Sequence, residues 1–179
     1  ANFPGINMSL THAFDESLTG TVYGGPRFLS STTQTPIGSI DADETVWLAG
    51  GSMMKKYERA SMQVTFARDL TPSGFGLLIQ TNRGEVSGTY DVSETLTCGL
   101  NVVGMLTTGK AGTAIGGTFP ESRYVSVTPK LTWRFLEWWL AEISYMYRWR
   151  DTDNALSTAE SHGTTFMVTY SPSRFSSSQ

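Results

Sequence analysis

Two neighbouring segments near the C-terminal end of the chain alternate between apolar and polar residues almost without interruption. They are Tyr124–Phe135 and Trp138–Arg150. A period of two residues indicates β-strands, and each segment is about twice as long as the ~5–6 residues of a typical globular strand. A tilted strand needs about 9–11 residues to cross a bilayer, with apolar side chains outside and polar ones inside. The pattern therefore predicts a transmembrane β-barrel.

The two faces of these segments carry different kinds of side chain. Aromatic and branched aliphatic residues gather on one face, and charged or hydroxyl residues gather on the other. The first face is expected to meet lipid, with its aromatic rings at the two membrane interfaces. The predicted lumen-facing polar residues are Lys130, Arg134, Glu142, Arg148 and Arg150, and the predicted interface aromatics are Trp133, Phe135, Trp139, Tyr145, Tyr147 and Trp149.

Each set leaves two interpretations open. The polar set could line a lumen that selects anions or sugars. It could instead fill a narrow barrel, with Glu142 paired to Lys130 or Arg134 across the hairpin. The aromatic set could be a platform on which sugars stack, although interface girdles are the more usual role of such rings in membrane barrels.

The composition agrees with a lipid face combined with an uncharged polar interior. Hydrophobic residues make up 39% of the 179 residues and charged residues only 16%, against about 45–50% and about 25% in soluble globular domains. No run of about 18 apolar residues is present, which excludes a transmembrane helix. The net charge of −3 argues against a nucleic acid partner, because there is no basic surplus to neutralise phosphates.

Short and long joints alternate along the chain, as they do in an up-and-down membrane barrel with short periplasmic turns and longer extracellular loops. The tight joints are 15–17, 58–59, 93–95 and 136–137; the long ones are 30–44, 71–82, 108–122 and 151–162. We expect a single β-barrel domain over residues 1–179, with 172–179 as a periplasmic tail. The expected strands are Ile6–Phe14, Leu18–Leu29, Thr45–Tyr57, Ala60–Leu70, Arg83–Val92, Leu96–Thr107, Arg123–Phe135, Trp138–Arg150 and Gly163–Ser171.

Two of these strands have irregular patterns. The register of Thr45–Tyr57 is ambiguous, because its apolar residues fall on both faces: Val46, Trp47, Leu48, Met53 and Met54. Pro129 has no N–H group and predicts a bulge or a local edge in its strand.

The strand count raises a question of closure. Single-chain bacterial barrels have an even number of strands, whereas this chain has about 8–9. Three arrangements stay open: eight strands with one N-terminal prediction wrong, a C-terminal part of a larger barrel, or a barrel built from several chains. The N-terminal residues show neither the charged region nor the apolar region of a signal peptide, so we expect a leader to have been removed or the chain to be a fragment.

Catalytic and metal chemistry have little support in the sequence. His162 shares a loop with Asp151, Asp153, Ser157 and Ser161, a combination that a hydrolase could use, but polar loops commonly carry such residues. The two histidines and the single Cys98 are too far apart for a metal motif. We therefore expect no enzymatic activity, no cofactor and no metal, and we expect Cys98 to act as a small apolar residue in the lipid-facing or buried surface.

Several stretches carry a resemblance to a known class of proteins. They are YERASMQVTFARDLTPSGFG, YDVSETLTCGLNV, LTWRFLEWWLAEISYMYRWRDTD and TTFMVTYSP. Together they cover roughly the last two thirds of the chain and resemble the C-terminal half of bacterial outer-membrane β-barrel proteins. Their residue pattern is similar to that of barrels encoded with exopolysaccharide export or exosortase systems. One departure is the end of the chain, which continues past Tyr170 and Phe175 to Gln179 instead of finishing on an aromatic residue.

The expected location is thus the bacterial outer membrane, with the lipid bilayer as the main partner. Other envelope proteins or further copies of the chain are expected as additional partners. The expected function is that of a non-enzymatic pore, or of a structural component of an envelope assembly. A soluble, secreted β-barrel or β-sandwich that binds a ligand is the alternative, and it predicts an inward-facing aromatic set. An outer-membrane hydrolase is a second alternative.

Overall fold

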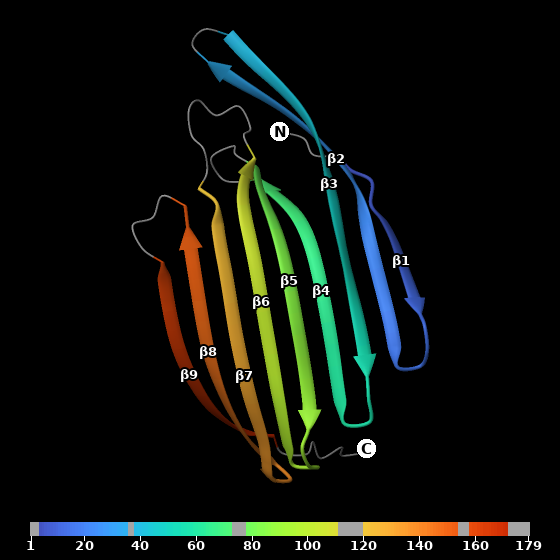
Figure 1. Ribbon diagram of the computed structural model, residues 1–179, viewed down its shortest axis with the longest axis vertical. Coiled ribbons are helices and arrows are strands. Elements are labelled where there is room, and N and C mark those ends of the chain that lie inside the picture. The colour runs from blue at the N-terminus through green and yellow to red at the C-terminus, as the bar shows by residue number, and fades with distance from the viewer. Residues whose placement is uncertain (1–3, 36–37, 73–77, 111–119, 154–157, 172–179) are drawn as a thin grey trace, which may run out of the picture.

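In the computed structural model, the described residues form one antiparallel sheet of nine strands that pair in chain order (Figure 1). The structure describes residues 4–35, 38–72, 78–110, 120–153 and 158–171. The antiparallel pairing in chain order confirms the predicted all-β, up-and-down architecture. The strands are β1 (Met8–Ala13), β2 (Leu18–Thr35), β3 (Gly38–Lys56), β4 (Ala60–Pro72), β5 (Leu78–Asp91), β6 (Leu96–Lys110), β7 (Ser122–Leu136), β8 (Trp139–Thr152) and β9 (Ala159–Tyr170).

Four tight turns join the strands at one end of the sheet, where the sequence predicts them. The Phe14 N–H donates to the Leu18 carbonyl at 2.9 Å, and the Tyr57 N–H donates to the Ala60 carbonyl at 2.7 Å. The tips of the long joints at the other end, and the tail 172–179 that was expected in the periplasm, lie outside the described residues. The joints alternate between the two ends of the sheet as predicted, but the joint between β2 and β3 spans only residues 36–37 and is therefore short.

The prediction of a long loop over 30–44 is wrong for most of that segment. Strands β2 and β3 continue through it and stay paired as far as Thr35 opposite Gly38, so their hairpin extends beyond the end of the sheet (Figure 1). Backbone pairing does not require apolar alternation, and threonine-rich segments such as this one favour extended structure. The other strand ends differ from the predicted ends by a few residues.

The irregularity predicted at Pro129 has a different form in the structure. Pro129 pairs with Leu100 of β6, and the pairing of β7 with β8 skips Thr128 and Pro129 without changing register. The missing N–H thus interrupts the ladder but inserts no residue. The register shift of this hairpin lies between Arg134 and Leu136, next to the turn.

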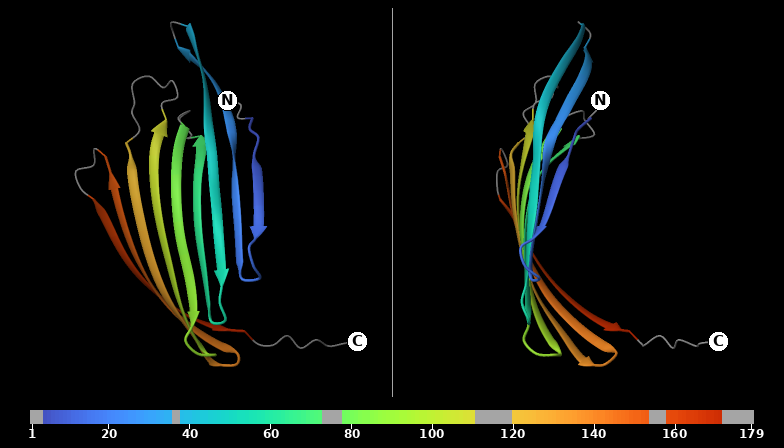
Figure 2. Two further views of the ribbon diagram at one scale, coloured as in Figure 1. Left: turned by 45° about the vertical axis from the view of Figure 1, so that its right-hand side comes forward. Right: turned by 90° about the vertical axis from the view of Figure 1, so that its right-hand side faces the viewer.

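The two faces of the sheet differ in exposure. Val46 and Leu48 are only 7% and 8% exposed, whereas Trp47 between them is 66% exposed. This resolves the ambiguous register of β3, with Val46 and Leu48 on one face and Trp47 on the other. The sheet is twisted and curved (Figure 2), and side chains on its inner face shield one another. We call the face of Val46 and Leu48 the inner face, and that of Trp47 the outer face.

Strands β1 and β9 form the two edges of the sheet and do not pair with each other (Figures 1 and 2). Every neighbouring pair is antiparallel, so strands of odd number all run in the same direction. Both edge strands therefore run the same way, and nine strands cannot close on themselves by antiparallel pairing. The open sheet agrees with a partial barrel.

Candidate functional site

The outer face carries a continuous layer of exposed apolar side chains. Leu10 of β1 is 66% exposed, Phe66 of β4 is 52% exposed and Phe166 of β9 is 69% exposed. Exposed apolar surfaces that extend far beyond a few hundred Å² mark contact with a membrane or another protein. Further exposed members of this layer are Met8, Val22, Trp47, Met53, Met62, Val86, Leu100, Val125, Leu131, Trp133, Ile143, Tyr145, Val168 and Tyr170.

A row of aromatic rings lies on this face beside the β7–β8 turn. The ring centroids of Trp133 and Phe135 are 5.5 Å apart, and those of Phe135 and Trp139 are 6.4 Å apart. Tyr170 of β9 extends the row, with its centroid 4.8 Å from that of Trp139. Three predicted interface aromatics therefore come together. Tyr170 is a fourth member that was not among the predicted interface aromatics, although it lies on the apolar side of the alternating last strand.

The other three predicted aromatics, Tyr145, Tyr147 and Trp149, follow one another along the outer face of β8. The Tyr145 hydroxyl lies 2.6 Å from Nδ1 of His162, and the Tyr147 ring centroid lies 5.2 Å from that of the same histidine. His162 thus belongs to the aromatic cluster of the outer face. Ser161 precedes it in β9, where alternation places it on the opposite face.

All five predicted lumen-facing polar residues share the inner face. In β7 and β8, residues directly opposite one another include Ser126 with Arg148 and Tyr124 with Arg150. Lys130 and Glu142 form an ion pair with 3.3 Å between Nζ and Oε2. Such a half-exposed pair contributes about 0–1 kcal/mol. That the inner face encloses a lumen remains a prediction.

A second polar cluster lies on the inner face of β5 and β6 and was not predicted from the sequence. Nη2 of Arg83 donates to Oε2 of Glu85 at 2.8 Å, and Nδ2 of Asn101 donates to Oε1 of the same carboxylate at 2.7 Å. Arg83 and Glu85 are two residues apart, so alternation puts them on one face. Alternation within the strand could therefore have predicted the Arg83–Glu85 contact. The contact with Asn101 could not be predicted without the register of β5 against β6.

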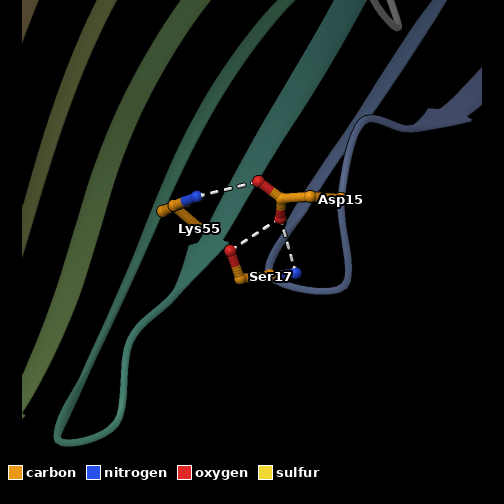
Figure 3. A network of polar contacts seen from close by, with 3 residues as sticks. All are labelled: Asp15, Ser17 and Lys55. Atoms are coloured by element: carbon orange, nitrogen blue, oxygen red, sulfur yellow. Dashed lines mark hydrogen bonds and ion pairs between the residues drawn. The ribbon is translucent and has the colours of Figure 1, made fainter.

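The turn between β1 and β2 is held by Asp15 (Figure 3). Its Oδ1 accepts hydrogen bonds from the hydroxyl and the N–H of Ser17 at 2.6 and 2.7 Å. Its Oδ2 forms an ion pair with Nζ of Lys55 at 3.2 Å. The bonds from Ser17 first, and then the one from Lys55, lower the pKa of Asp15 to about 2. This network connects the turn to strand β3.

An apolar groove of about 540 Å³ runs along the outer face over β1 to β4. Its floor consists of Gly20, Ala49 and Gly51, where the absence of large side chains lowers the surface. The residues that rise around it include Leu10, His12, Phe14, Met53, Val64 and Phe66. Cys98 lies further along the outer face on β6, because it pairs with Tyr90 and Leu131.

In the described part of the chain, no group of three or more His, Cys, Asp or Glu side chains is placed to hold a metal ion. Within the same residues, no helix is long and apolar enough to span a membrane.

Solved structures with the same arrangement are outer-membrane proteins. The in-vitro folded form of OmpT, an outer membrane protein of Vibrio cholerae, aligns with a TM-score of 0.57 at 14% identity, over 94% of this chain and 55% of that one. The outer-membrane expressed form of OmpT aligns with a TM-score of 0.59 at 14% identity, over 95% and 56%. The chain has the fold of these outer-membrane β-barrels, and it spans little more than half of their length. No family model and no curated protein sequence matches the chain.

Proposed function

We propose that the sheet is part of the wall of a non-enzymatic pore in the bacterial outer membrane. The observation that carries the proposal is the contrast between the two faces of a single-layered sheet. Its outer face exposes apolar and aromatic side chains such as Trp133 and Ile143, while its inner face carries charged and hydroxyl groups. A membrane barrel needs this contrast, because lipid lies outside and water or polar side chains lie inside.

The width of the sheet supports an open lumen. Eight-stranded barrels are just wide enough to be filled by their own side chains. An antiparallel barrel with an even number of strands that includes these nine has at least ten. Small side chains also occupy many inner positions, which leaves space for solutes: Ser52, Ser61, Thr65, Ser87, Thr89, Gly99, Ser126, Ser144, Gly163 and Thr165.

The structure argues against a soluble ligand-binding protein. That alternative requires the aromatic set to point inward, whereas Trp133, Tyr145 and Tyr170 are exposed on the outer face. A structural role in an envelope assembly, such as one that exports exopolysaccharide, needs the same outer face but no open lumen. The two roles can therefore be distinguished by whether a membrane that contains the protein becomes permeable to small solutes.

Liposome swelling tests the pore directly. The native-length protein, purified from outer membranes and reconstituted into vesicles, is expected to admit small neutral sugars and to exclude larger ones. Ser144→Trp, on the inner face, should slow sugar entry, while Ile143→Trp, on the neighbouring outer position, should leave it unchanged. Vesicles that contain the folded protein but do not swell would favour the structural role.

A further inference from the structure

We propose that the inner wall formed by β7 and β8 makes this pore select small anions over cations. The inference rests on the proposed pore function and names the class of solute. Its starting point is a reversal of charge within the molecule. The whole chain has a net charge of −3, yet on the described inner face the basic side chains outnumber the acidic ones.

The face of each charged residue follows from strand pairing, because opposite partners share a face. Many acidic residues lie away from the inner face: Glu16, Glu58, Glu94 and Glu137 are in the tight turns, and Asp151 and Glu160 are on the outer face. Among the side chains that the structure describes, the inner face carries the basic residues Arg27, Lys56, Arg83, Lys130, Arg134, Arg148 and Arg150, and the acidic residues Asp69, Glu85, Asp91 and Glu142.

Most of these carboxylates already have partners within the wall. Glu85 is bound by Arg83 and Asn101. Asp91 accepts a hydrogen bond from the Thr97 hydroxyl at 2.7 Å, and Glu142 pairs with Lys130. These contacts reduce the attraction that the acidic groups can offer to a passing cation.

Arg148 and Arg150 form the strongest positive feature of this wall. They follow one another on the inner face of β8, about 7 Å apart along the strand, and both are exposed. Nε of Arg150 donates to Oγ of the buried Ser122 at 3.1 Å, which orients its guanidinium. Neither arginine has an acidic partner among the described residues.

The neighbours of these two arginines add no negative charge. Arg148 lies between Ser126 of β7 and Ser161 of β9, and Arg150 lies between Tyr124 and Ala159. A guanidinium stays ionised at any physiological pH and binds carboxylate or phosphate oxygens through paired donors. At physiological ionic strength its field extends about 8 Å. The two guanidinium groups therefore attract anions that pass this wall. A wall that carries charge of one sign raises the local concentration of ions of the opposite sign.

Reversal potentials in planar bilayers under a KCl gradient test the inference, with native-length protein. We expect a sign that shows preference for chloride, and a preference that weakens as the salt concentration rises. The double variant Arg148→Gln/Arg150→Gln should shift the reversal potential toward potassium. Arg123→Gln, on the outer face of β7 opposite Asp151, removes one charge at a similar height and should leave the potential unchanged.

The outcomes separate the two proposals. Absence of channels, together with absence of swelling, would overturn the pore itself. Channels that show no chloride preference would overturn anion selection while the pore stands. A chloride preference that survives the double variant unchanged would show that the β8 arginines are not its cause.

Discussion

Hairpins β7–β8 and β2–β3 are both long antiparallel pairs, but their faces are determined in different ways. In β7–β8 nearly every residue alternates in polarity, so the faces follow from side-chain type alone. In β2–β3 the pattern is interrupted by Gly24, Gly25, Gly50 and Gly51. There, other groups of the protein lie close to the glycine backbone. A Cβ on Gly50 would meet the Tyr23 ring, and a Cβ on Gly25 would meet the carbonyl of Ile6. In one sheet, the alternation of polar and apolar side chains determines the two faces of β7–β8, whereas the space available at glycine positions constrains β2–β3.

The β7–β8 side of the comparison is tested most strongly by a charge at the centre of its outer face. Ile143→Arg should cost about 2–4 kcal/mol of unfolding free energy, because a cation would replace an apolar side chain at mid-bilayer depth. Denaturant titration of the protein refolded into lipid vesicles measures this cost. Ser144→Arg, one residue later on the inner face, should be clearly milder, and equal costs for the two variants would contradict the assignment of faces.

The β2–β3 side is tested by adding a single methyl group. Gly25→Ala should cost about 1–3 kcal/mol, because the new Cβ would collide with the backbone of the N-terminal segment at Ile6. Gly84→Ala is the matched control, since no atom lies within 4 Å of the Cβ it would add. The same denaturant titration applies, and a Gly25 variant as stable as the Gly84 variant would remove the argument from close approach.

The aromatic row beside the β7–β8 turn should contribute a smaller amount. Trp139→Leu is expected to lose about 0.5–1.5 kcal/mol beyond the change in buried area, because the contacts of its ring with Phe135 and Tyr170 disappear. Trp47→Leu on the outer face of β3 serves as control, since the described residues give Trp47 no ring partner. A similar loss in both variants would mean that ring contacts add no stability beyond that of the buried area.

The smallest effect is expected at the β1–β2 turn and depends on pH. Because the pKa of Asp15 falls from its ordinary value of 3.8 to about 2, the ionised carboxylate stabilises the folded turn. This contribution is complete above about pH 4 and is lost as the pH falls toward 2. The protection factor of the Ser17 amide, which corrects the exchange rate for the intrinsic effect of pH, should therefore decrease over this range in the wild type. Asp15→Asn should abolish that pH dependence, and Glu16→Gln in the same turn should preserve it.

Much of the fold could be predicted from the sequence. The meander order and the tight turns followed from alternation and from joint length. Alternation also assigned the members of the two faces in β7 and β8, including Arg148 and Trp149. These features are local, because a period of two decides which way each side chain points.

The parts that could not be predicted depend on contacts between strands. Strands β2 and β3 stay paired through 30–35 and 38–44, where no apolar alternation signals a strand. The partner of Glu85 among the neighbouring strands depends on register, which places Asn101 within reach. The register shift beside Phe135 arises where the hairpin turns, whereas the more visible signal at Pro129 produces no shift.

The most direct test of whether the outer face meets lipid is the electrophoretic behaviour of the native-length protein extracted from fractionated membranes. Folded outer-membrane barrels resist SDS until they are heated, so samples run with and without boiling should migrate differently. Protein recovered in the outer-membrane fraction is expected to show this shift. A protein found in the soluble fraction, with the same mobility before and after boiling, would contradict the claim that the outer face meets lipid.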